Sequence, residues 1–133
     1  MDEIATAHSV CFSHEGGQLL AGLDGECRMF DTSVPGKESS KISLASQGQK
    51  GIISTMVMSS NNVLAMGTYN RHIGLYDSGS GQQIELLDNV HQGGLTSLKF
   101  MPNNPNQLVS AARKCDMIKV RSKCQDLKIL TIV

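Results

Sequence analysis

The chain has 133 residues, of which 40% are hydrophobic and 18% are charged, the composition of an ordinary globular domain. Its 12 basic and 12 acidic residues cancel, so no overall charge attracts nucleic acid or membrane, and any such contact must be local. The apolar runs are short, and the N-terminus lacks the basic, apolar and small-residue succession of an export signal, so we expect an intracellular chain.

The first part of the chain is predicted to contain short strands separated by polar connections. Residues 7–13 have the composition of a strand, in which successive side chains point to opposite faces. Residues 34–46 are rich in Ser, Gly and Lys, and they form a polar connection around a further predicted strand at residues 41–44.

The middle of the chain carries the clearest pattern of strands and turns. The predicted strands there are residues 52–58, 63–66, 73–77 and 83–87, and turns rich in Ser, Asn or Gly separate them. Four short antiparallel strands make one small sheet. Such a sheet is stable only when it buries a face against a neighbour.

The same spacing is repeated three times, at intervals of 42 to 46 residues. The matched positions are Phe12, Met58 and Phe100, then Gly22, Gly67 and Ala111, and finally the pairs Phe30–Asp31, Tyr76–Asp77 and, poorly, Val120–Arg121. A period of this length with several short strands is typical of one β-propeller blade per repeat. We therefore predict an all-β fold of about three four-stranded antiparallel blades, at about residues 4–46, 47–88 and 89–133, with the last one degraded.

The blade openings resemble those of the WD40 family, in which a His stands nine residues before the Phe that closes the first strand. His91 stands nine residues before Phe100. Gln49 takes this position in the second repeat and Glu3 takes it in the first. The resemblance therefore implies a structural, blade-opening role for His91.

The WD40 family also places an Asp in the turn before the third strand and a Trp-Asp pair at its end. In that family the Asp, His, Ser/Thr and Trp form a buried hydrogen-bond network. No repeat here has the full set, although Thr68 stands at the Ser position. By resemblance, the remaining structural repeat positions are Asp24, Phe30, Asp31, Asn70, Tyr76 and Asp77.

Three blades do not close a ring, because propellers have about 4 to 8 blades. We therefore expect a partial WD40-type propeller in which the two end blades have open faces and unpaired edges. This favours the hypothesis that the 133 residues are a fragment of a longer propeller, an alternative product or an inaccurate gene prediction.

Five phrases in order resemble a narrower family, the telomerase Cajal body proteins. They are AHSVCFS at 7–13, GQKGIIS at 48–54, GTYNRHIGLY at 67–76, HQGGLTSLKF at 91–100 and SAARK at 110–114. The resemblance implies a nuclear adaptor, not an enzyme, that binds small Cajal-body RNAs and telomerase RNA and delivers RNAs to Cajal bodies. The implied partners are these RNAs, the telomerase ribonucleoprotein and other proteins at the propeller rims, with no cofactor and no small-molecule substrate.

Turns before the third strands hold the candidate RNA-binding residues, which are Tyr69, Arg71, Arg113 and Lys114. Cations there contact phosphates, and an exposed aromatic ring offers a surface on which a base stacks. The alternative interpretation is an ordinary solvated turn. At the level of the whole chain, the alternatives are a protein-interaction scaffold without RNA affinity and a truncated product without function.

The sequence gives only weak signals for a metal site, a catalytic site or a phosphate-binding loop. His8, Cys11 and His14 are closely spaced, but residues 8 and 11 of a strand point to opposite faces, so we expect no metal site and no catalytic pair. The segment 79–81 is a turn without the helix that a phosphate-binding loop requires. The four cysteines lack CxxC spacing and are expected to be free thiols.

Overall fold

The computed structural model describes residues 7–13, 16–33, 38–88, 94–102, 104–113 and 125–131. The elements in chain order are β1 (Ser9–Phe12), β2 (Gln18–Gly22), β3 (Glu26–Asp31), β4 (Glu38–Ser43), the short 3-10 helix η1 (Ala45–Gln47), β5 (Ile53–Met58), β6 (Val63–Thr68), β7 (Ile73–Asp77), β8 (Gln83–Leu87), β9 (Leu95–Met101), β10 (Asn104–Arg113) and β11 (Gln125–Thr131). In this part of the chain no helix is long and apolar enough to cross a membrane.

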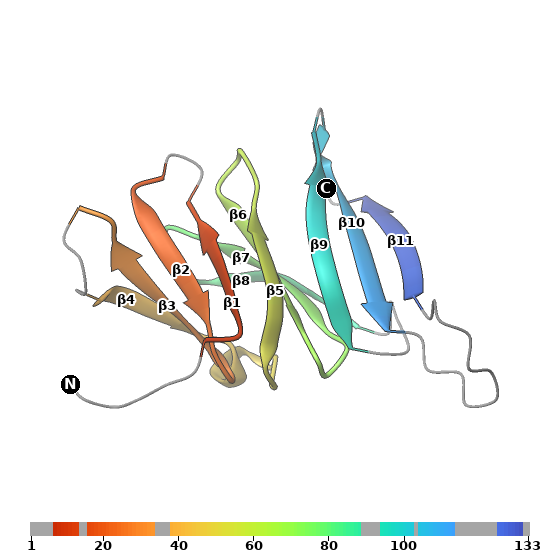
Figure 1. The fold of residues 1–133 in the computed structure, drawn as a ribbon, viewed down its shortest axis with the longest axis horizontal. Coiled ribbons are helices and arrows are strands. Elements are labelled where there is room, and N and C mark those ends of the chain that lie inside the picture. The colour runs from red at the N-terminus through yellow and green to blue at the C-terminus, as the bar shows by residue number, and fades with distance from the viewer. Residues whose placement is uncertain are drawn as a thin grey trace.

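The strands form three antiparallel sheets that stand side by side, as Figure 1 shows. Sheet 1 has the order β1-β2-β3-β4, sheet 2 the order β5-β6-β7-β8, and sheet 3 the order β9-β10-β11. The predicted all-β fold is therefore confirmed. Within the described residues sheet 3 has three strands, where four were expected.

The strand register tests the repeat that the sequence analysis identified. Phe12 pairs with Leu19, Met58 with Leu64, and Phe100 with Leu108. Gly22, Gly67 and Ala111 each follow three residues after those partners, on the second strand of their sheets. These two sets of repeat positions are therefore structurally equivalent.

The third set of repeat positions, the aromatic-Asp pairs, has a different partner in sheet 3. Leu19 faces Phe30 and Leu64 faces Tyr76, but Leu108 faces Leu130. By this register, the pair Leu130–Thr131 stands where the aromatic-Asp pair stands in the other sheets, while Val120–Arg121, which the repeat spacing selected, lies outside the described residues. Residues 114–124 separate β10 from β11, so a constant period could not locate the strand.

Each pair of neighbouring sheets encloses a hydrophobic core. The core between sheets 1 and 2 is formed by Leu20, Cys27, Met29, Ile42, Leu44, Ile53, Met56, Leu64, Met66 and Tyr76. The core between sheets 2 and 3 is formed by Ala65, Ile73, Leu75, Leu95, Leu98, Leu108 and Ala112. Sheet 2 is apolar on both sides because it separates the two cores, and Val63–Thr68 accordingly has five buried residues in succession.

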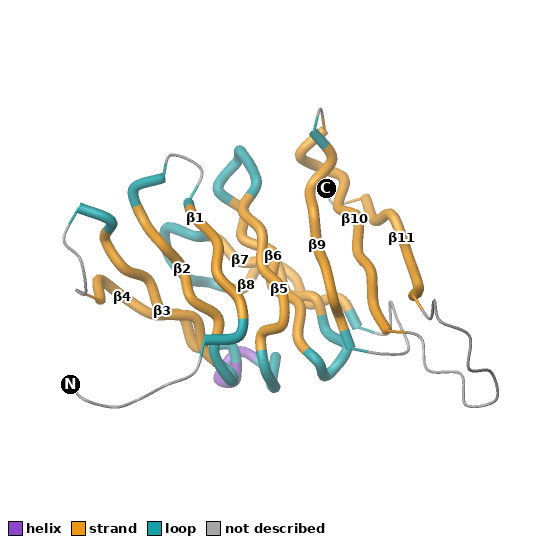
Figure 2. The backbone as a smooth tube through the Cα atoms, viewed as in Figure 1, coloured by secondary structure: helices purple, strands orange, loops and turns teal. Residues whose placement is uncertain are grey.

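The first strands of the three sheets, β1, β5 and β9, lie next to one another, as the backbone in Figure 2 shows. This close approach requires glycine on the strand beside each contact. A Cβ added to Gly67 would lie 2.9 Å from Leu95 Cβ and 3.0 Å from Thr55 Cγ2. One added to Gly22 would lie 2.7 Å from Ile53 Cγ2. The repeated glycine therefore lets the next sheet pack against bare backbone.

We expect Gly67→Ala to destabilise the fold by about 1 to 3 kcal/mol, because the added methyl overlaps Leu95 and forces the two sheets apart. Urea unfolding followed by circular dichroism measures the loss. Gly17→Ala is the matched control, since nothing lies within 4 Å of the added methyl there. Equal stabilities of the two variants would contradict this account of the repeated glycine.

Candidate nucleic-acid interface

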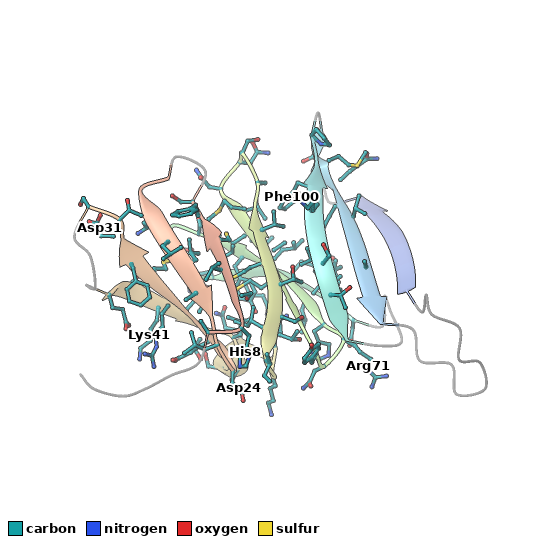
Figure 3. All side chains as sticks on the ribbon, viewed as in Figure 1. His8, Asp24, Asp31, Lys41, Arg71 and Phe100 are labelled. Atoms are coloured by element: carbon teal, nitrogen blue, oxygen red, sulfur yellow. The ribbon has the colours of Figure 1, made fainter. Side chains whose placement is uncertain are left out.

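One end of the sheets is built from the turns that precede the third strands and from the segments that open the first strands. Figure 3 shows His8, Asp24 and Arg71 along this end, which we call the rim. Backbone hydrogen bonds join its parts: Gly25 N donates to Gly51 O at 2.9 Å, and Tyr69 N donates to Ile52 O at 3.1 Å. The rim is therefore a fixed surface that crosses from sheet 1 to sheet 2.

The turn between β6 and β7 presents two of the predicted RNA-binding residues to solvent. The Tyr69 side chain is 53% exposed, and Arg71 is exposed with a left-handed φ of 71°. Arg71 N donates to Thr68 O at 3.1 Å, which closes the turn. Because a non-glycine residue rarely adopts such a φ, the turn aims Arg71 away from the sheet at some conformational cost.

The Tyr69 ring is positioned by the start of sheet 3. A Cβ on Gly94 would lie 2.5 Å from Tyr69 Cδ1 and 3.3 Å from Tyr69 Cα, so only glycine fits beside the ring. Lys50, which the sequence analysis did not select, is exposed on the connection that opens sheet 2. The phrase GQKGIIS contained it, but nothing in the sequence marked it as a rim residue.

The other two predicted RNA-binding residues follow β10. Arg113 ends this strand and pairs with Gln125, so a strand extends to a position where a turn was predicted. The register makes Arg113 the counterpart of Tyr69, because Ala111 corresponds to Gly67. Lys114 and His91 lie outside the described residues, as does Glu3.

The predicted aspartates lie apart from one another. Asp24 is exposed on the rim and forms an isolated backbone bridge with Ile52. Asp31 Oδ1 accepts from Ser33 N at 2.9 Å and from Ser33 Oγ at 2.8 Å. Asp77 closes the corresponding turn of sheet 2, where its Oδ1 accepts from Gly79 N at 3.1 Å. Asp31 and Asp77 thus terminate strands, and Phe30 before Asp31 is half-buried.

A buried hydrogen-bond network supports the rim from within sheet 2. Gln49 is fully buried, and its Nε2 donates to Met66 O at 3.0 Å and to His72 O at 3.3 Å. Tyr76 donates its hydroxyl to Gln49 Oε1 at 2.7 Å and accepts from Gln83 Nε2 at 3.0 Å. One glutamine therefore ties the opening of sheet 2 to three of its strands and to the turn.

This network uses the positions that the WD40 resemblance selected, with different side chains. Gln49 takes the place of the blade-opening His, and Tyr76 takes the place of the Trp. Burial raises the pKa of Tyr76, so its hydroxyl stays protonated and able to donate. Asn70 does not join the network. Its carboxamide lies against Gly51, where a Cβ added to that glycine would be 3.0 Å from Asn70 Oδ1.

The structure offers no catalytic role for the candidate His8 and Cys11. His8 is exposed, while Cys11 donates its thiol to Phe12 O at 3.4 Å. Burial raises the pKa of Cys11 to about 11, so the thiol is protonated near neutral pH and is a poor nucleophile. Cys11 and Cys27 are free thiols, and no group of three or more metal-binding side chains occurs among the described residues, which do not include His14.

Proteins named telomerase Cajal body protein 1 are similar in sequence to this chain. The mouse protein, from Mus musculus, is 44% identical over 117 residues, which are 86% of this chain and 22% of that protein. The Homo sapiens protein is 43% identical over the same length, and a homolog from Drosophila melanogaster is 32% identical over 124 residues, or 89% of this chain and 22% of that homolog. The chain thus spans about a fifth of the length of these relatives. It matches no protein-family profile.

Solved structures agree on the fold. The WD40 repeats of RRP9 superpose with a TM-score of 0.71 at 16% identity, over 84% of this chain and 34% of that one. Sqt1 from Chaetomium thermophilum gives a TM-score of 0.66 at 20% identity, over 78% of this chain and 28% of that one. The predicted WD40-type propeller architecture is therefore confirmed.

We expect Tyr76→Phe to lower the free energy of unfolding by about 1 to 3 kcal/mol, because it leaves the buried Gln49 Oε1 without its donor. Chemical denaturation measures the difference. Tyr69→Phe removes the same atom from an exposed ring and should change stability by less than about 0.5 kcal/mol. If both variants are equally stable, the network does not hold sheet 2 together.

Proposed function

We propose that this WD40-repeat chain, which is homologous to telomerase Cajal body protein 1, is an adaptor that binds small Cajal-body RNAs and telomerase RNA and directs RNAs to Cajal bodies. The observation that carries the proposal is the 44% identity to the mouse protein across 86% of the chain. Because the homologous family is non-enzymatic, the chain has an adaptor role and no catalytic one. Its proposed location is the nuclear Cajal body.

The rim is the surface that we assign to RNA. Tyr69 offers an exposed ring on which a base can stack. The exposed side chains of Arg71 and Lys50 offer cations for phosphates. We also assign Arg113 and Lys114 to RNA. The backbone register makes Arg113 the counterpart of Tyr69, and Lys114 lies outside the described residues. The zero net charge of the chain makes this local set of cations important, because no overall field attracts RNA.

The stacking and electrostatic contributions to this binding can be separated. We expect Tyr69→Ala to weaken binding by about 1 to 3 kcal/mol, the energy of one stacked base. Arg71→Ala removes one phosphate contact and should reduce the slope of log K against log salt by about 0.7 for single-stranded RNA. Fluorescence anisotropy with a labelled small RNA that contains the Cajal-body box measures both quantities.

Lys41→Ala is the control for Arg71→Ala, because Lys41 is an exposed cation on β4 of sheet 1 and lies far from Arg71 in Figure 3. It should leave affinity and salt slope unchanged. An RNA with a mutated Cajal-body box should bind more weakly to the unaltered chain. Equal binding of the two RNAs would overturn the proposed specificity, and partners that copurify after nuclease treatment would favour a protein-interaction scaffold instead.

A further inference from the structure

The turn between β6 and β7 places the Asn70 side chain at an exposed corner of the rim. Arg71 N donates to Thr68 O at 3.1 Å, so residues 68–71 form a four-residue turn with Tyr69 and Asn70 as its central pair. Both central side chains are exposed. The sheets of this fold contact each other through their faces, as Figure 1 shows, so the packing of sheets leaves turns at the strand ends uncovered.

The amide of Asn70 lies flat on Gly51, the residue before the opening of sheet 2. A Cβ added to Gly51 would lie 3.0 Å from Asn70 Cγ, 3.0 Å from Oδ1 and 3.3 Å from Nδ2. Because these three distances are nearly equal, the plane of the amide faces Gly51 and neither polar atom points at it. Among the described residues, none forms a hydrogen bond with the Asn70 side chain. Its donor and its acceptor are therefore available side by side for a ligand.

The surroundings of this amide suit a nucleotide. Gly51 has a left-handed φ of 103°, a conformation that favours glycine, and any larger residue there would push against the amide. Lys50 directly precedes Gly51 and is exposed, as is Arg71 directly after Asn70. Cations position a nucleic acid through its phosphates, whereas contacts to base edges specify its sequence. Asn70 can supply the second kind of contact beside residues that supply the first.

A carboxamide matches the Hoogsteen edge of one base better than that of the others. Adenine presents its N6 amino donor next to its N7 acceptor on this edge. Guanine presents two acceptors, O6 and N7, while a pyrimidine presents a single donor or a single acceptor. An asparagine therefore forms two hydrogen bonds with adenine but only one with each of the other bases. Unpaired loops of RNA splay such edges out for recognition.

We propose that Asn70 recognises an adenine of the RNA that the rim binds, an inference that rests on the proposed function. Asn70 Oδ1 accepts from the N6 amino group of the base, and Asn70 Nδ2 donates to N7. The Tyr69 ring lies against Gly94 at the start of sheet 3, whereas the Asn70 amide lies against Gly51, so the ring stacks on a neighbouring nucleotide. Asn70 thereby gives the rim a base preference that stacking and phosphate contacts alone lack.

A change of one atom in the RNA tests this contact without altering the protein. The probe is the labelled small RNA with the Cajal-body box, made with 7-deazaadenosine in place of every adenosine. This analogue lacks N7 but keeps its Watson–Crick edge, so the base pairs of the RNA are preserved. The unaltered chain should bind it about tenfold more weakly than the parent RNA, because the two-bond match to adenine is lost. Fluorescence anisotropy measures both affinities.

A variant of the protein assigns the effect to Asn70. Asn70→Ala should bind the parent RNA about tenfold more weakly than the unaltered chain does, and it should bind the two RNAs equally. Asn61→Ala is the matched control, because Asn61 is an exposed asparagine in the turn between β5 and β6, at the opposite end of β6 from the rim. It should keep both the affinity and the tenfold difference. Far-UV circular dichroism verifies that each variant keeps its strand content.

Each outcome supports or overturns the assignment of Asn70. A difference between the two RNAs that disappears in Asn70→Ala and persists in Asn61→Ala supports it. Equal binding of the two RNAs by the unaltered chain overturns it and leaves the proposed RNA-binding function intact. A difference that persists in Asn70→Ala also overturns it, because another residue then contacts N7. Failure of the unaltered chain to bind either RNA overturns the proposed function together with this inference.

Discussion

The contact between the first strand of one sheet and the glycine of the sheet before it is the constraint on which the structure depends. A four-stranded sheet of short strands has too little apolar surface to be stable alone, so it must pack closely against its neighbour. Gly22 and Gly67 permit that approach because Ile53 and Leu95 occupy the space where a Cβ would be. The two cores and the side-by-side order of the sheets both follow from repeating this contact.

The hydrogen-bond network of sheet 2 acts within one sheet, whereas those contacts act between sheets. Gln49 binds carbonyl groups of β6 and of the turn after it, and Tyr76 connects it to β7 and β8. These bonds fix the end of the sheet, whereas the glycine contacts fix its sides. A buried amide fits this role well, because its nitrogen donates while its oxygen accepts. The Tyr76 hydroxyl supplies the donor that the Gln49 oxygen needs. The exposed turn at Tyr69 is thereby held on a rigid base.

Most of the fold was predictable from the sequence because local signals and the repeat agreed. The four strands of sheet 2 lie where alternation and turn residues placed them, and Gln49 was identified from its spacing to Met58. The last strand of sheet 3 could not be located from the sequence, because the long separation between β10 and β11 breaks the period and no aromatic-Asp pair marks the end of β11. The hydrogen-bond partners of Gln49 could not be predicted either, because packing decides which carbonyl groups its amide reaches. Lys50 was missed because exposure, not residue type, distinguishes it.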